Sequence, residues 1–152
     1  MECDDFSKIN KTKLNNASTI VFSPGPGSPK DYPLSSKIYK ELKGKKRIIG
    51  ICLGFQQILF SEGAQIIEQN KIYHGFQSKV VVNKSSKIFN EGQKFKVGRY
   101  HSLKLKEPFI AENFDITMRC DISGAAMSFE NNVDKIYGFQ FHPESFLTVN
   151  GK

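Results

Sequence analysis

A cysteine flanked by two glycines has the clearest chemical potential of any residue in this chain. Cys52 follows residues 48–51, a short apolar run typical of a buried strand, and precedes a segment with helical periodicity. Gly50 and Gly54 give it the Gly-x-nucleophile-x-Gly pattern of a nucleophile elbow, with sulfur in place of a serine oxygen. Glycine fits such a turn because no side chain has room on either flank. We expect the N–H groups at the start of the helix to favour a nucleophilic thiolate, although most buried free cysteines only fill space.

A nucleophilic thiol needs an imidazole as base, and the imidazole needs a partner that orients it. Of the three histidines, His142 ends an apolar strand-like run and precedes Pro143, which favours an extended backbone. Side chains two apart in an extended segment point the same way, so Glu144 can reach the His142 ring. A surface histidine beside a capping glutamate is the alternative. His74 and His101 have no carboxylate at such a spacing, and a structural role fits them better.

Acyl transfer also requires N–H donors for the oxyanion of the tetrahedral intermediate. The backbone N–H of Leu53, next to the nucleophile, is one candidate. Residues 24–27, a Pro-Gly-Pro-Gly loop, follow another strand and offer a second, because glycine lets backbone N–H groups approach a ligand closely. An ordinary tight turn is the alternative for this loop.

Alternating strands and helices must position these groups. Residues 18–22 and 48–51 read as short buried strands. Residues 31–42, with apolar residues every fourth position, and 55–61 read as helices, the second with Gly63 as its C-cap. This order favours an α/β fold with a parallel sheet and helices on its faces.

The chain after this point is rich in short strands. The runs that alternate or are β-branched are residues 65–68, 78–82, 103–106, 116–119, 125–129 and 136–141. The segment between the last two runs has the composition of a hairpin turn. We therefore expect antiparallel strands added to a mostly parallel sheet, in a single domain spanning residues 1–152.

Composition excludes several classes of protein. No apolar run is long enough to cross a bilayer. The cysteines (Cys3, Cys52 and Cys120) are widely spaced, which predicts neither a disulfide framework nor a zinc site and makes a cytosolic location the default. The net charge of +7 raises the question of nucleic acid, but the lysines are scattered and only residues 43–47 form a dense patch. We expect neither a nucleic-acid nor a membrane partner.

Five segments together resemble the class I glutamine amidotransferases, and they occur in that family's order. They are residues 23–29, 50–56, 74–75, 97–103 and 138–145. The Ser-Pro-Gly-Pro-Gly and Arg-Tyr-His-Ser-Leu forms favour the amidotransferase subunit, component II, of anthranilate synthase and aminodeoxychorismate synthase. The GMP and carbamoyl-phosphate synthetase relatives differ at these points. The resemblance implies a flavodoxin-like domain that hydrolyses glutamine and passes ammonia to a chorismate-using synthase subunit, component I.

The resemblance also implies a role for each matching residue. Cys52 would attack the glutamine carboxamide, His142 would carry the proton to the leaving ammonia, and Glu144 would orient His142. The N–H groups of Gly27 and Leu53 would form the oxyanion hole. The residues implied to bind glutamine are Gly25, Pro26, Gly27, Gln56, Ser102 and Leu103. No metal or organic cofactor is expected, since thiolate attack supplies the chemistry.

The sequence departs from the family pattern at position 55 and at both ends. Phe55 stands where histidine is usual, and because that residue is outside the triad we expect altered packing rather than lost chemistry. The family's N-terminal β-α-β unit and its C-terminal helix find no match, and the first strand of that unit lies in the middle of the sheet. An unpaired central strand exposes backbone groups and apolar surface. We therefore expect a poorly stable monomer or self-association.

Two other functions stay open from the sequence. One is a catalytically silent subunit that only binds its synthase partner. The other is a cysteine hydrolase of a different flavodoxin-like family, against which the Phe-His-Pro-Glu and Arg-Tyr-His-Ser-Leu segments argue. The sequence also leaves open whether the product enters tryptophan or folate synthesis.

Overall fold

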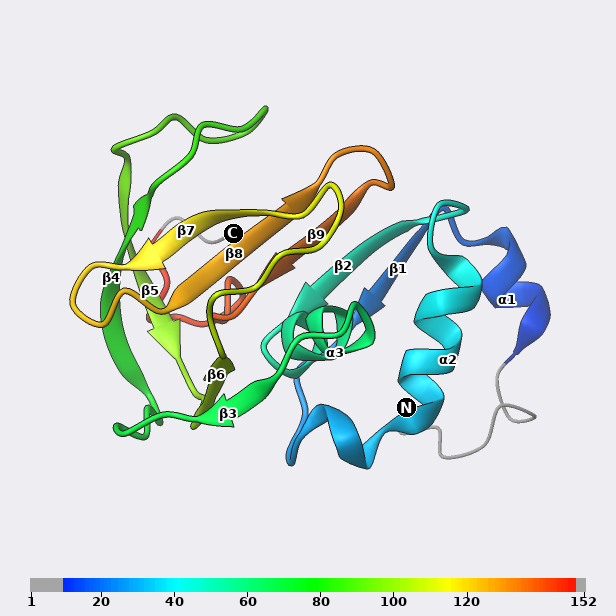
Figure 1. Cartoon of the computed structure of the whole chain (residues 1–152), viewed down its shortest axis with the longest axis horizontal. Coiled ribbons are helices and arrows are strands. Elements are labelled where there is room, and N and C mark those ends of the chain that lie inside the picture. The colour runs from blue at the N-terminus through cyan, green and yellow to red at the C-terminus, as the bar shows by residue number, and fades with distance from the viewer. Residues whose placement is uncertain (1–9, 150–152) are drawn as a thin grey trace.

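A computed structural model describes residues 10–149 as a curved sheet with helices packed on one end of it (Figure 1). The helices are α1 (Lys11–Asn16), α2 (Pro33–Leu42), which follows a 3-10 turn at Pro29–Asp31, and α3 (Leu53–Ser61). The strands are β1 (Thr19–Phe22), β2 (Arg47–Ile51), β3 (Ile66–Glu68), β4 (Phe76–Val82), β5 (Lys94–Arg99), β6 (Leu103–Leu105), β7 (Asp115–Cys120), β8 (Ala126–Asn131) and β9 (Ile136–Phe139).

The main sheet has seven strands in the order β1-β2-β9-β8-β7-β4-β5, and β3 and β6 form a separate antiparallel pair. Strands β1, β2 and β9 run parallel, as the first half of the sequence predicted. The hairpin after β8 reverses the chain, so the strands on the far side of β9 are antiparallel. The α/β class with a parallel core and added antiparallel strands is confirmed. Within the main sheet of the described residues the antiparallel part is the larger, with four strand pairs against two.

The elements follow the sequence pattern with two exceptions. Strand β5 was not predicted, since its lysines and the Gly98-Arg99 end hide the alternation of Phe95 and Val97. Helix α1 was not predicted either, because it buries no residue and depends on the Asn10 side chain, which accepts a hydrogen bond from the Lys13 N–H at 2.9 Å. Helical propensity and a cap can start a short helix that no apolar stripe announces.

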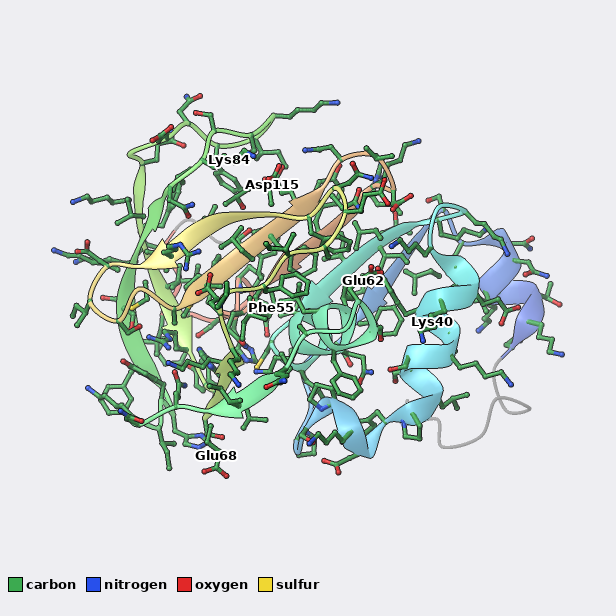
Figure 2. All side chains as sticks on the ribbon, in the orientation of Figure 1. Lys40, Phe55, Glu62, Glu68, Lys84 and Asp115 are labelled. Atoms are coloured by element: carbon green, nitrogen blue, oxygen red, sulfur yellow. The ribbon has the colours of Figure 1, made fainter. Side chains whose placement is uncertain are left out.

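Two apolar clusters fill the interior. The first lies between α2, α3 and the parallel strands and includes Tyr39, Ile48, Ile58 and Ile136. Phe55 belongs to it, is fully buried between α3 and the sheet, and stands 5.2 Å from the Phe129 ring between centroids (Figure 2). The second cluster lies in the antiparallel part and comprises Val80, Val82, Val97, Met118, Cys120, Ala125, Met127 and Phe141.

One edge of the main sheet, at β1, has no neighbour in residues 10–149. Strand β1 pairs with β2 on one side only, and Val21 in its middle is 55% exposed. None of the helices in the same range is long and apolar enough to cross a membrane.

Candidate active site

Cys52 lies at the turn between β2 and α3, in a backbone conformation that few residues adopt. Its φ is 52° and its ψ is −102°. A Cβ on Gly50 would stand 2.6 Å from the carbonyl carbon and oxygen of Gly54, and a Cβ on Gly54 would stand 2.0 Å from the carbonyl oxygen of Phe22. The sharp turn with obligatory glycines, predicted from the sequence, is therefore present. A non-glycine residue at positive φ costs free energy, and such residues cluster at functional sites.

Cys52 is 6% exposed, and its surroundings shift the pKa of its thiol in opposite directions. Burial raises its pKa to about 11, the N–H of Leu53 donates to the sulfur and lowers it, and the carboxylate of Glu144 raises it further. The expected preference for thiolate is wrong for this chain by itself, because desolvation outweighs the donor at the start of α3. The Leu53 N–H nevertheless lies beside the sulfur and donates to it.

His142 follows β9, the parallel neighbour of β2. The Cys52 N–H donates to the Phe139 carbonyl at 2.8 Å, so the two chain segments leave the sheet side by side. The Nδ1 of His142 lies 2.7 Å from Oε1 of Glu144, as the spacing of two residues predicted. Its Nε2 is buried and has no hydrogen-bond partner in residues 10–149. The imidazole thus has one nitrogen bound by a carboxylate and one nitrogen available.

A cavity of about 130 Å³ opens beside Cys52. It is lined by Gly25, Pro26, Gly27, Cys52, Leu53, Gln56, His74, Tyr100, His101, Ser102 and Leu103. All six residues expected to bind glutamine are among them, together with Cys52 and both residues expected to form the oxyanion hole. His142 and Glu144 do not line this cavity, and Tyr100, which does, contacts the His142 ring at 4.9 Å between centroids.

The loop of residues 25–27 is fixed beside the start of α3. Gly27 has a φ of +76°, and a Cβ there would stand 2.6 Å from Oδ2 of Asp31. The hydroxyl of Tyr32 donates to the Pro26 carbonyl at 2.9 Å. A Cβ on Gly25 would stand 3.0 Å from the Leu53 side chain. Glycine at positions 25 and 27 therefore lets the backbone run close to the nucleophile.

The opposite wall of the cavity has most of its polar groups already paired. The Gln56 amide donates to the Leu103 carbonyl at 3.3 Å, and Nδ1 of His101 bonds to the same oxygen at 2.7 Å. The Ser102 carbonyl accepts from the Gln69 N–H at 2.9 Å, within the pairing of β3 with β6. In that register the neighbouring Leu103 N–H is directed away from β3. It is therefore the backbone donor on this wall that a ligand can use.

The sequence did not reveal a fully buried arginine behind this wall. Arg99 donates from Nε to Nε2 of His101 at 3.0 Å and from Nη2 to Oε1 of Gln69 at 3.3 Å. Its guanidinium carbon stands 3.5 Å from the centre of the Tyr73 ring, and Nη1 lies 3.4 Å from Sγ of Cys120. No carboxylate of the described residues pairs with it, and burial lowers its pKa. Its place in the Arg-Tyr-His-Ser-Leu segment was the one signal available.

His101 lines the cavity, but its bonded ring fits the structural role expected from its sequence context. Burial and the nearby charge of Arg99 lower its pKa to about 4, so the ring is neutral and both nitrogens are bonded. His74 lies on the cavity wall, a position that its sequence context did not indicate. Among residues 10–149, no group of three or more histidine, cysteine or acidic side chains is arranged to bind a metal ion.

Comparison with known proteins connects this geometry to named relatives. The profile of the family described as "Glutamine amidotransferase class-I" matches residues 1–152. "Anthranilate synthase component 2" of Lactococcus lactis subsp. lactis (strain IL1403) is 40% identical over 149 residues, which cover 97% of this chain and 74% of that protein. The protein of the same name from Helicobacter pylori (strain 26695) is 37% identical and matches 98% of this chain and 72% of its own length. "Bifunctional protein TrpGD" of Thermotoga maritima is 36% identical over 98% of this chain and 25% of its own length.

Solved structures give the same fold. A putative GMP synthase protein from Thermoplasma acidophilum superposes with a TM-score of 0.79 at 24% identity, over 94% of this chain and 71% of that one. A glutamine amidotransferase from Thermotoga maritima superposes with a TM-score of 0.72 at 20% identity, over 86% and 58% of the two chains. At such identities the likeness concerns the fold, and it confirms the fold class expected from the five segments.

Proposed function

The chain belongs to the class I glutamine amidotransferase family, and from this premise we propose that it hydrolyses glutamine and supplies ammonia to a chorismate-using synthase subunit. The observation that carries the proposal is the cavity beside Cys52, which joins the elbow to the loop of residues 25–27 and to the backbone of Ser102 and Leu103. Main-chain donors and one amide side chain suit a small polar substrate such as glutamine.

In the proposed reaction, Nε2 of His142 takes the proton of the Cys52 thiol while Sγ attacks the carboxamide carbon. Because the pKa of the thiol is raised to about 11 by burial, a general base must remove this proton during the attack near neutral pH. Glu144, bonded to Nδ1, orients the imidazole and stabilises its cationic form.

The tetrahedral intermediate places a negative oxygen next to the N–H groups of Leu53 and Gly27, which serve as its donors. His142 returns the proton to the departing nitrogen, so ammonia leaves and a thioester remains on Cys52. Water then attacks the thioester, its proton passes through His142 to the sulfur, and glutamate is released. Each step balances without a metal or an organic cofactor.

The relatives support a choice of synthase partner and product. Proteins named anthranilate synthase component 2 are 32–40% identical over most of this chain, which favours anthranilate formation and tryptophan synthesis. Formation of 4-amino-4-deoxychorismate, on the folate route, is the alternative product. Assays with chorismate and glutamine, followed by chromatography of the product, distinguish the two.

The decisive experiment measures glutamate and ammonia release by the chain together with its synthase partner. Wild type is expected to be active and Cys52→Ala inactive, and a diazo-ketone analogue of glutamine is expected to label Cys52 and block turnover. Cys120→Ser, which changes another buried free thiol, is the matched control and keeps activity. A chain that co-purifies with the synthase but releases no ammonia would instead be a silent binding subunit. Failure of the glutamine analogue to label Cys52 would favour the other cysteine hydrolases.

We also propose that the free edge of β1 is a site of self-association in the isolated chain. Its support is the one-sided pairing of β1 and the exposure of Val21. Edge strands with exposed apolar residues pair readily with other chains.

A further inference from the structure

Tyr100 borders the cavity and also contacts His142. It lines the cavity together with Cys52, and its ring meets the His142 ring edge to face, with centroids 4.9 Å apart and planes at 70°. Glu144 bonds to the Nδ1 edge of the imidazole only. Tyr100 is therefore the cavity residue that touches the body of the His142 ring.

The Tyr100 ring is itself fixed to the chain segment that carries His142. Its hydroxyl lies 3.0 Å from Oγ of Ser145, and the Ser145 N–H donates to the His142 carbonyl at 3.2 Å. The contacts form a closed circuit from Tyr100 through Ser145 to His142 and back to the Tyr100 ring. A displacement of either ring must break one of these contacts.

The backbone of His142 is also fixed, by β5. The His142 N–H donates to the Gly98 carbonyl at 3.0 Å, and Oγ1 of Thr148 donates to the His142 carbonyl at 2.5 Å. The same Thr148 oxygen accepts the Gly98 N–H at 2.9 Å. What stays free is rotation of the imidazole about its side-chain bonds.

The carboxylate of Glu144 restrains that rotation weakly. Its side chain is 56% exposed, while that of His142 is 15% exposed. Water competes for an exposed carboxylate, so a pair of this kind holds its partner only weakly. A second restraint is needed to keep Nε2 in one direction, and an aromatic ring packed on the imidazole provides it.

We propose that Tyr100, tethered through Ser145, is a positioning residue that keeps Nε2 of His142 directed at the thiol side of the cavity. The inference rests on the proposed function, in which His142 is the base. Tyr100 acts through His142 and takes no proton itself.

The test compares two substitutions at position 100 in the complex with the synthase. Tyr100→Leu removes the ring, and kcat for glutamine hydrolysis is expected to fall about 10- to 100-fold, the cost of a misplaced general base, while KM changes less than about threefold. Tyr100→Phe keeps the ring and loses only the hydroxyl that bonds to Ser145. Its kcat is therefore expected to stay within about fivefold of wild type, so this conservative variant retains most of the function. Tyr137→Leu and Tyr137→Phe are the matched controls, because the Tyr137 hydroxyl bonds to Asn132 away from the cavity.

A second measurement does not depend on turnover. Nitrogen NMR of the His142 ring in the wild-type chain is expected to show the Nδ1–H tautomer, because Glu144 accepts from Nδ1. Tyr100→Leu is expected to mix the tautomers or broaden the signals, whereas Tyr100→Phe and the Tyr137 variants keep the wild-type spectrum.

The outcomes separate the two proposals. If wild type releases no ammonia but the NMR signals respond as expected, the proposed function fails and the positioning stands. If Tyr100→Leu keeps kcat within twofold, or raises KM alone, the positioning is overturned while the function stands. Should Tyr100→Leu fail to fold, Tyr100→Met, which also lacks the aromatic ring, takes its place with the same expected fall in kcat. A kcat within twofold of wild type, or an effect on KM alone, would again overturn the inference.

Discussion

At the scale of single residues, the reactivity of Cys52 is a balance between its burial and the donors around it. The elbow gives the sulfur one N–H donor, from Leu53, but also removes it from water. The thiol is therefore protonated at rest and becomes a nucleophile only when a base takes its proton. Such a site reacts slowly with electrophiles that do not bind in the cavity.

The alkylation rate of Cys52 tests this balance. Because burial raises the pKa of the thiol to about 11, we expect the rate of reaction with iodoacetamide to keep rising as pH increases through 9 and to reach half its maximum near pH 11. Mass spectrometry of the Cys52 peptide measures the rate, and Cys120→Ser removes the other buried thiol of residues 10–149 from the background. A rate that levels off near pH 7 would mean a preformed thiolate.

Replacement of Glu144 is expected to change alkylation and turnover in opposite directions. Burial is the main cause of the raised pKa of Cys52, and the Glu144 carboxylate adds to it. Glu144→Gln should therefore shift the alkylation profile to lower pH. It should also lower kcat about tenfold or more, because the charge that stabilises protonated His142 is lost. The pH profile of alkylation and the glutaminase assay measure the two effects, and a parallel change in both would contradict the assigned role.

Local sequence predicted the local part of the site and missed the rest. The elbow glycines each stand two positions from Cys52, and Glu144 stands two positions from His142, so spacing along the sequence suffices to predict both features. The raised pKa of Cys52 and the burial of Arg99 depend on what packs around them. Packing of this kind comes from distant segments and leaves no pattern near either residue.

At the scale of elements, the segment of residues 142–148 lies across β5, and Gly98 makes this crossing possible. A Cβ at position 98 would stand 2.8 Å from Oγ of Ser145 and 3.0 Å from Cβ of Leu147. This glycine belongs to one of the five motif segments, but the strand that contains it was not predicted. The reason for the glycine is a contact with a segment more than forty residues away.

Gly98→Ala is expected to move the segment that carries His142 without touching the cavity. Overpacking of this kind lowers the free energy of unfolding by about 1–3 kcal/mol. We expect urea denaturation to show this loss of stability and the glutaminase assay to show a lower kcat. Gly54→Ala, whose Cβ would meet the Phe22 carbonyl oxygen at 2.0 Å, is the severe comparison and should prevent folding. A Gly98→Ala chain with wild-type kcat would mean that the crossing does not influence His142.

At the scale of the whole molecule, we expect the edge of β1, which has no neighbour in residues 10–149, to influence how the isolated chain behaves in solution. The edge lies beside the parallel strands that carry Cys52, on the opposite side of β2 from β9. The exposure of Val21 fits the expected self-association, which stays a prediction. The single domain over residues 1–152 and the cytosolic location also stay predictions.

Val21→Lys is expected to reduce self-association, because a charged side chain on an edge strand opposes pairing with another chain. Sedimentation velocity over a range of concentrations should show larger species for wild type than for Val21→Lys. Val133→Lys, which makes the same change at a position 69% exposed outside β1, should behave like wild type. A wild-type chain that stays monomeric and melts at high temperature would contradict the prediction.

The two apolar clusters have a consequence for catalysis. Cys52 and the loop of residues 25–27 are attached to elements of the first cluster, whereas Tyr100 directly follows β5, which packs in the second. Strand β8 joins the two clusters, since Phe129 belongs to the first and Met127 to the second. A substitution that shifts β5 by a fraction of an ångström leaves the first cluster intact but moves Tyr100 relative to Cys52 and His142. Turnover is therefore a more sensitive gauge of the alignment of β5 with the first cluster than any melting temperature.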